Sequence, residues 1–206
     1  MYKRKDGFYR QAKLKGYRSR AAFKLKQLNQ DYHLIKRGDR VVDLGCAPGG
    51  WMQVARELVG EEGYVLGIDM IPIENLEGKN MAFLQGDIRE ERVAESIREK
   101  LGGRADMVMS DLSPNLTGIR HADHHHSIQL SQDAFRLAKR VLKQKGNFLV
   151  KTFLGPDFGS FKKEIEAAFQ TVKATRPEAT RKASRELYLI GRGYQGQNQG
   201  GELSNL

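Results

Sequence analysis

The chain has 206 residues, one cysteine and a formal net charge of +10 at pH 7. This length suits a single domain with one sizeable core, and no apolar run approaches the roughly 18 residues of a membrane-spanning helix. One cysteine, Cys46, excludes an intrachain disulfide, so we expect a cytoplasmic protein.

The positive charge is concentrated at the N-terminus. Residues 1–28 hold ten Lys or Arg against one acidic residue, so this segment carries +9 and the rest of the chain only +1. Four aromatic residues lie among these cations: Tyr2, Phe8, Tyr9 and Tyr17. Cations and aromatic rings bind phosphates and stack on unpaired bases, which predicts an RNA-binding arm over residues 1–17. A solvated tail is the alternative. Binding to an anionic membrane surface fits less well, because no clean apolar face is visible. A secretory signal is not indicated, because no apolar stretch follows the basic residues.

Short apolar runs then alternate with amphipathic stretches. Helical periods are expected at residues 19–30, 51–59, 90–100, 128–143 and 160–168, and strands at 40–45, 64–69, 81–86, 106–111 and 147–153. This alternation predicts an α/β fold with parallel strands and helices on both faces of the sheet. Two further runs, 169–175 and 186–191, have no helix between them and predict an antiparallel pair. The Gly/Gln/Asn-rich residues 192–206 predict a disordered tail, which leaves 18–191 as the folded domain.

The sequence VVDLGCAPGGW at 41–51 predicts a strand, a glycine-rich turn and the start of a helix. Ligands of open parallel sheets lie at the carboxyl ends of the strands, and glycines let the backbone approach them closely. Gly45 and Gly49 are four residues apart, so the dinucleotide spacing G-x-G-x-x-G is absent, as is a phosphate-loop lysine. A nicotinamide oxidoreductase is therefore disfavoured.

Carboxylates stand at four successive strand ends: Asp43, Asp69, Asp87 and Asp111. A single aspartate there is usually a helix cap, but four in register favour a binding site that repels pyrophosphate and suits a cation. S-adenosylmethionine offers an ammonium, a sulfonium, ribose hydroxyls and an adenine amine. We expect Asp69 to accept from the ribose hydroxyls and Asp87 from the adenine amine.

Two lysines lie in apolar surroundings, where a lysine is costly. Lys24 is part of AAFKL, and Lys151 lies in FLVKTF at the end of the fifth strand. Asp111 ends the fourth strand in SDLSPN, and Glu186 opens the last strand in SRELYLI. A lysine that extends its amine to solvent and a salt-bridged strand end are the structural alternatives.

With these motifs the chain resembles the FtsJ/RrmJ family of RNA 2′-O-methyltransferases. The likeness spans about residues 15–191 and includes YRSRAAFKL, VVDLGCAPGGW, GIDM, GDI, SDLSPN, LVKTF and SRELY. It implies a Rossmann-like class I methyltransferase fold, a mostly parallel seven-stranded sheet with one antiparallel strand. It implies a catalytic tetrad of Lys24, Asp111, Lys151 and Glu186. It also implies S-adenosylmethionine contacts from Gly49, Trp51, Asp69, Asp87 and Asp111.

The chemistry of a ribose 2′-hydroxyl explains these residue types. The hydroxyl is a poor nucleophile and needs a base or oriented hydrogen bonds. Lys151 is the candidate base, and to act so it must be neutral. Burial and the nearby charge of Lys24 favour the neutral amine, whereas Asp111 and Glu186 oppose it. The sequence leaves open which effect is larger.

Two polar clusters complete the pattern. The run HADHHH at residues 121–126 is expected to form a polar loop near the active site and to hold no metal, because adjacent loop residues rarely surround one ion. A second basic cluster precedes Glu186 and consists of Arg176, Arg181, Lys182 and Arg185. It is expected to face the active-site edge and bind RNA, with a solvated turn as the alternative.

The sequence thus predicts methylation of a ribose 2′-hydroxyl of RNA, with a uridine of large-subunit (23S) ribosomal RNA, free or in the subunit, as the expected substrate. The LSPN run after Asp111 resembles the ribosomal branch of the family, and the tRNA anticodon-loop enzymes are the alternative. A non-catalytic RNA-binding ribosome-assembly factor is the alternative from another class. No heptad run is visible, so we expect a monomer.

Overall fold

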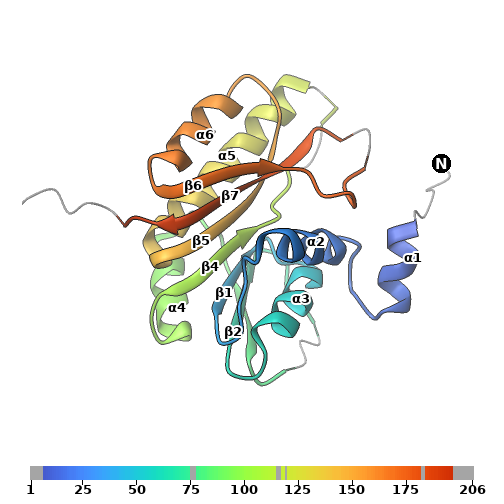
Figure 1. Ribbon diagram of the computed structural model, residues 1–206, viewed down its shortest axis with the longest axis vertical. Helices are drawn as coiled ribbons and strands as arrows, with labels where there is room; N and C mark the ends of the chain where they lie inside the picture. The colour runs from blue at the N-terminus through green and yellow to red at the C-terminus, as the bar shows by residue number, and fades with distance from the viewer. Residues whose placement is uncertain (1–6, 75–77, 115–116, 119, 182–183, 197–206) are drawn as a thin grey trace, which may run out of the picture.

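The structure of the protein, a computed structural model, describes residues 7–74, 78–114, 117–118, 120–181 and 184–196 (Figure 1). Its centre is a seven-stranded sheet in the order β3-β2-β1-β4-β5-β7-β6. The strands are β1 (Arg40–Leu44), β2 (Tyr64–Asp69), β3 (Met81–Gln85), β4 (Ala105–Ser110), β5 (Leu142–Phe153), β6 (Phe169–Thr175) and β7 (Glu186–Tyr194).

Strand direction decides where the site can form. Strands β1 to β5 pair in parallel, and β7 is antiparallel to both of its neighbours, β5 and β6. The predicted sheet with one antiparallel strand is therefore confirmed. The order reverses between β1 and β4, the kind of switch point where α/β sheets open a crevice at their carboxyl edge. Because β7 runs the other way, its first residue, Glu186, lies beside Phe153 at the end of β5.

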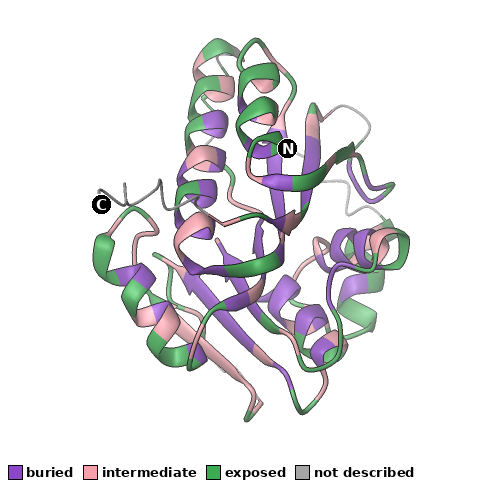
Figure 2. Ribbon diagram, turned by 60° about the vertical axis from the view of Figure 1, so that its left-hand side comes forward, coloured by how far each residue is buried: buried purple, intermediate pink, exposed green. Residues whose placement is uncertain are grey.

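Helices cover both faces of the sheet, as expected (Figures 1 and 2). Helices α2 (Ala22–Tyr32) and α3 (Gly50–Val59) pack on one face. Helices α4 (Glu91–Leu101), α5 (Arg120–Val141) and α6 (Phe158–Glu166) pack on the other. Alternate residues of β5 lie in the two cores. Phe148 and Val150 pack in the core with α4, α5 and α6, and Leu149 packs in the core with α2 and α3. Each fully buried side chain of this size contributes about 1.5–3 kcal/mol.

The histidine run is where the sequence prediction is wrong. Residues 121–126 lie in the first turns of α5 and not in a loop. The Asp123 carboxylate accepts hydrogen bonds from the backbone N–H groups of Thr117 (2.7 Å) and Gly118 (3.1 Å), which ties the preceding segment to the helix. His124 packs on Gly155, where an added Cβ would lie 2.4 Å from the imidazole. These tertiary contacts extend α5 about two turns before the apolar period that begins at Ile128.

The N-terminal segment also contains a helix that the sequence analysis does not predict, α1 (Gly7–Leu14). Its Phe8 ring packs 5.8 Å from that of Phe23 in α2, and Ala12 is buried. The exposed side of this segment carries Arg10, Lys13 and Lys15. At the other end, β7 continues past the predicted end of the strand to Tyr194, and residues 197–206 lie outside the described residues.

Candidate active site

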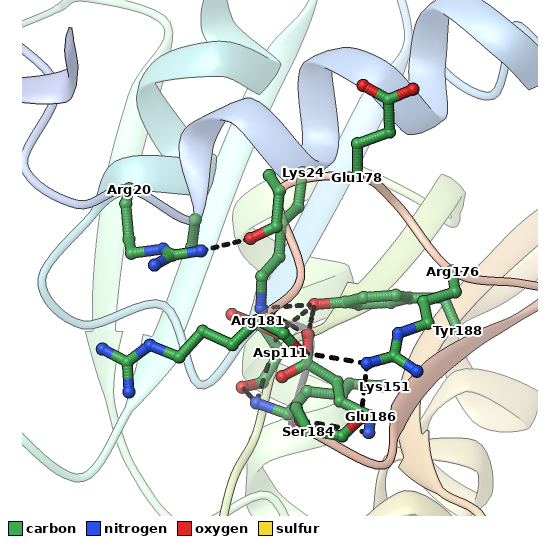
Figure 3. A network of polar contacts seen from close by, with 12 residues as sticks. Arg20, Lys24, Asp111, Lys151, Arg176, Glu178, Arg181, Ser184, Glu186 and Tyr188 are labelled. Carbon is green, nitrogen blue, oxygen red and sulfur yellow. Dashed lines mark hydrogen bonds and ion pairs between the residues drawn. The ribbon is translucent and has the colours of Figure 1, made fainter. Parts of the chain in front are cut away.

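Four elements meet at the carboxyl edge of the sheet and bring the predicted tetrad together (Figure 3). Asp111 follows β4, Lys151 lies near the end of β5, and Glu186 opens β7. Lys24 comes from the first turn of α2. Its amine forms an ion pair with the Glu186 carboxylate. Lys151 Nζ donates to the Asp111 carbonyl oxygen at 2.6 Å and lies 3.2 Å from Asp111 Oδ1.

Tyr188 joins these two ion pairs into one network. Its hydroxyl lies 2.7 Å from Asp111 Oδ1 and 3.2 Å from Glu186 Oε1, and it accepts from Lys24 Nζ at 3.3 Å. A phenol has a single proton to donate, and the shorter distance assigns that proton to Asp111. Residues of α2, β7, β5 and the segment after β4 thereby form one continuous chain of polar contacts.

The network is almost withdrawn from solvent. Lys24 is 9% exposed, Lys151 6% and Tyr188 0%. Buried charges are tolerated only when they are paired, and each ammonium here has a carboxylate. Burial, followed by the charges of Asp111 and Glu186, raises the pKa of Tyr188 well above its usual value. Tyr188 therefore stays protonated and acts as a donor that orients Asp111, not as a base.

Tyr188 was missing from the residues expected at the site, although the sequence holds a signal for it. In a strand, residues two apart lie on the same face, so SRELY places Tyr188 beside Glu186. A buried tyrosine also requires a partner for its hydroxyl. Trp51 packs against it with ring centroids 5.8 Å apart, and the indole N–H donates to the Ala21 carbonyl at 2.8 Å.

The glycine-rich turn after β1 lies next to this network. Gly45 has a φ of 75°, and a Cβ there would approach the Leu112 side chain to 2.5 Å, so the turn packs directly on the segment that follows Asp111. Gly49 has a φ of 104° and immediately precedes α3. Arg18 crosses the turn and donates to the carbonyl oxygens of Pro48 (3.3 Å) and Glu74 (2.8 Å).

The four strand-end carboxylates have different surroundings. Asp43 is fully buried, and neither of its carboxylate oxygens has a hydrogen-bond partner among the described residues. Burial first, and then the charges of Asp111 and Asp69, raise the pKa of Asp43 well above its usual value. Three acids are thus close enough to repel one another, which favours a cation beside them.

Asp69 and Asp87 already have partners in the structure. Asp69 accepts from the backbone N–H groups of Ala47 and Ile71, each at 2.9 Å. Asp87 faces Arg89, whose Nε lies 2.9 Å and 3.0 Å from the two carboxylate oxygens, and this contact lowers the pKa of Asp87. A ligand that binds Asp87 has to share it with the exposed Arg89.

A cavity of about 640 Å³ opens on the other side of the network. Lys24 and Glu186 lie in its wall together with Phe153, Leu154 and residues from the segment before β7. The cavity lining contains neither Asp69 nor Asp87. Of the tetrad, Lys24 and Glu186 thus border this cavity, whereas Asp111 lies close enough to Asp43 to act on its charge.

The arginines of the second basic cluster have two different roles. The Arg176 guanidinium donates to the carbonyl oxygens of Arg181 (2.9 Å) and Ser184 (2.5 Å) and so fixes the fold of the segment before β7. Arg181 and Arg185 are exposed and line the cavity, as the sequence predicts for this edge. Lys182 lies outside the described residues, as do the first six residues of the basic arm.

His124 contacts protein groups in this structure. Its Nε2 accepts from the Asp157 N–H at 3.2 Å. In the part of the chain that the structure describes, no three His, Cys, Asp or Glu side chains are grouped to hold a metal ion. Within the same residues, none of the helices is long and apolar enough to span a bilayer.

Comparison with known proteins gives the family. Residues 17–194 match the FtsJ-like methyltransferase model. A ribosomal RNA large subunit methyltransferase E from Methanothrix thermoacetophila is 53% identical over 188 residues, which is 91% of this chain and 72% of the relative. The protein of the same name from Methanothermobacter thermautotrophicus is 47% identical and covers 96% of this chain and 93% of its own length. The chain belongs to the FtsJ-like methyltransferase family.

Solved structures agree with this membership. A ribosomal RNA methyltransferase from Plasmodium falciparum superposes on this FtsJ-like chain with a TM-score of 0.78 at 29% identity, covering 88% of this chain and all of the other. An Aeropyrum pernix fibrillarin with bound S-adenosyl-L-methionine shares the fold, with a TM-score of 0.58 at 16% identity over 83% of this chain and 73% of its own. The Rossmann-like methyltransferase fold expected from the sequence is thus confirmed.

Proposed function

We propose that this FtsJ-like chain transfers a methyl group from S-adenosylmethionine to the ribose 2′-hydroxyl of a uridine in large-subunit ribosomal RNA. The observation that carries the proposal is the buried network of Lys24, Asp111, Lys151, Glu186 and Tyr188 at the carboxyl edge of the sheet. The names of the relatives, at 47% and 53% identity, support ribosomal RNA as the substrate.

The residues present fit S-adenosylmethionine as the methyl donor. Asp43 holds two carboxylate oxygens without partners among the described residues, beside Asp69 and Asp111, and a bound cation would relieve the repulsion among these three acids. The glycine turn at 45–49 allows close approach of a ligand to the backbone. The residues that would hold it are Gly49, Trp51, Asp69, Asp87 and Asp111. When bound, S-adenosylmethionine supplies a methyl group made electrophilic by the attached sulfonium.

Lys151 is the group to which we assign acceptance of the proton of the 2′-hydroxyl. Its amine contacts the carbonyl and carboxylate oxygens of Asp111, and only a neutral amine can accept that proton. Glu186 and Lys24 lie in the wall of the cavity, where they orient the hydroxyl. Asp111 keeps the Lys151 amine in place, and holding these groups in line lowers the barrier by several kcal/mol.

Two alternatives make different predictions. A tRNA methyltransferase of the same family would use the same network on another RNA. A non-catalytic RNA-binding assembly factor would have no use for two lysines buried at this edge, where each costs desolvation energy. Assays with ribosomal RNA and tRNA, as free transcripts and as large subunits, distinguish the three: transfer to tRNA alone, or to no RNA, contradicts the proposal.

The role of Lys151 is tested by Lys151→Ala. We expect methyl transfer to fall about 10²- to 10⁴-fold, the usual contribution of a positioned acid or base, with calorimetric binding of S-adenosylmethionine retained. Lys162→Ala is the matched control, because Lys162 pairs with Glu166 on α6, away from the network. Transfer by the Lys151 variant at the parent rate would show that another group takes the proton.

A further inference from the structure

We infer that the cavity beside Lys24 and Glu186 is a pocket for one unpaired nucleotide of the acceptor RNA, with a phosphate held by Arg20 and Arg181 and the base against Leu154. The inference rests on the proposed function, because it identifies this cavity as the acceptor side of the same site. It adds that the enzyme requires a nucleotide which has left its helix.

The position of the reactive groups supports an unpaired acceptor. The side chains of Lys24 and Glu186 are only 11% and 12% exposed, so they lie in a recess and not on the surface. At about 640 Å³, the cavity has the size of pockets that enclose a single small ligand. A paired ribose in an A-form helix is held in a wide, shallow groove of a stiff duplex. It can reach the recess only if its nucleotide swings out of the stack.

The apolar part of the cavity wall suits a base. Leu154 is 52% exposed, an unusual exposure for a large aliphatic side chain beside a buried polar network. Phe153 precedes it and pairs across the sheet with Glu186. The His124 ring forms another part of the wall and can approach there only because residue 155 is a glycine. Proteins that bind single-stranded RNA use such aromatic and apolar surfaces as platforms for unstacked bases.

The charges at the cavity favour a phosphate. The pKa of Arg20 is lowered by burial and then by the like charge of Arg181, so these two guanidinium groups are close enough to repel. Figure 3 shows both on the same side of the network. Arg20 already donates to the Ala179 carbonyl oxygen, which holds its guanidinium in place, and a phosphate between the two arginines would relieve their repulsion. Asp123 accepts from Thr117 and Gly118, and Glu186 pairs with Lys24 while its charge also acts on Arg20, so a phosphate would share Arg20 with Glu186.

The pocket is tested with Arg181→Gln and Leu154→Ala on the RNA to which the parent transfers methyl. We expect each variant to raise the KM for RNA about tenfold, with kcat, Tm and S-adenosylmethionine affinity unchanged. Arg181→Gln should also reduce the salt dependence of RNA binding by about one phosphate contact. Arg92→Gln is the matched control, since Arg92 lies on α4 and pairs with Glu90.

A second arm tests the need for an unpaired nucleotide. A complementary oligonucleotide annealed over the mapped acceptor should abolish transfer, and one annealed to a distant segment should not. If both variants have the same KM for RNA as Arg92→Gln, or if the annealed acceptor is methylated as fast as the unpaired one, the assignment of the cavity as a nucleotide pocket is wrong while the proposed function stands. If the parent methylates no RNA, the proposed function itself fails.

Discussion

Replacing Tyr188 by phenylalanine removes one atom from the centre of the network. The ring and its packing against Trp51 remain, as does the ion pair between Lys24 and Glu186. Asp111 loses the hydroxyl donor at 2.7 Å, and Lys24 loses an acceptor at 3.3 Å. If the hydroxyl holds the Asp111 carboxylate in position for Lys151, its removal should affect catalysis more than folding.

The magnitudes follow from the contacts. A buried hydrogen bond to a charged group contributes about 1.5–3 kcal/mol. Asp111 keeps its contact with Lys151, so we expect a loss of about 2 kcal/mol, which lowers Tm by roughly 4–8 °C in a chain of this size. Misplacement of a catalytic group by about 1 Å can reduce the rate about 10²-fold. We therefore expect kcat to fall about 10- to 100-fold with an unchanged KM for RNA.

Tyr194→Phe is the matched control in the same strand. Its hydroxyl donates to the neutral Lys139 carbonyl at 3.1 Å, and the side chain is buried in the core on the opposite face. Thermal unfolding and steady-state methyl transfer are measured for both variants. The control should lose about 1 kcal/mol of stability and no activity. If Tyr188→Phe likewise loses only stability, or if its KM rises while kcat is kept, the positioning role of Tyr188 is refuted.

Two other predictions concern charge. The folded protein holds the Asp43 proton more tightly than the unfolded chain, so Asp43 destabilises the fold increasingly as pH rises from the ordinary aspartate range near about 4 towards the raised pKa. In thermal unfolding across pH, the free energy of unfolding of Asp43→Asn should therefore exceed that of the parent by about 1 kcal/mol near pH 7 and equal it at low pH. In calorimetry, the affinity of the variant for S-adenosylmethionine should fall about tenfold. A stability difference that does not depend on pH would contradict this prediction. Deletion of residues 1–17 should weaken RNA binding and flatten its salt dependence in filter-binding assays, and unchanged affinity would remove the arm from the RNA surface.

The sheet could be predicted from the sequence because its strands are near-continuous apolar runs between helical periods. Strand–helix alternation fixes parallel neighbours, and parallel strands end at one edge, so Asp43, Asp69 and Asp111 had to come together there. The pairing of Asp87 with Arg89 could not be predicted in this way, because it is set by the local turn after β3.

The remaining features depend on tertiary contacts. The start of α5 lacks an apolar period, and its helical form rests on Asp123 and on the fit of His124 against Gly155, 31 positions along the chain. Helix α1 is short and basic and rests on the contact between Phe8 and Phe23. Tyr188 becomes important only because β7 is antiparallel and directs that residue between two ion pairs.

The central claim is that the buried lysine and acid network directs methyl transfer to a ribose hydroxyl. The most direct measurement is mass spectrometry of nucleosides from large-subunit RNA incubated with S-adenosylmethionine and the parent protein or Lys151→Ala. We expect a new 2′-O-methyluridine with the parent and none above background with the variant. A methyl group on a base, or equal 2′-O-methylation by both proteins, would contradict it.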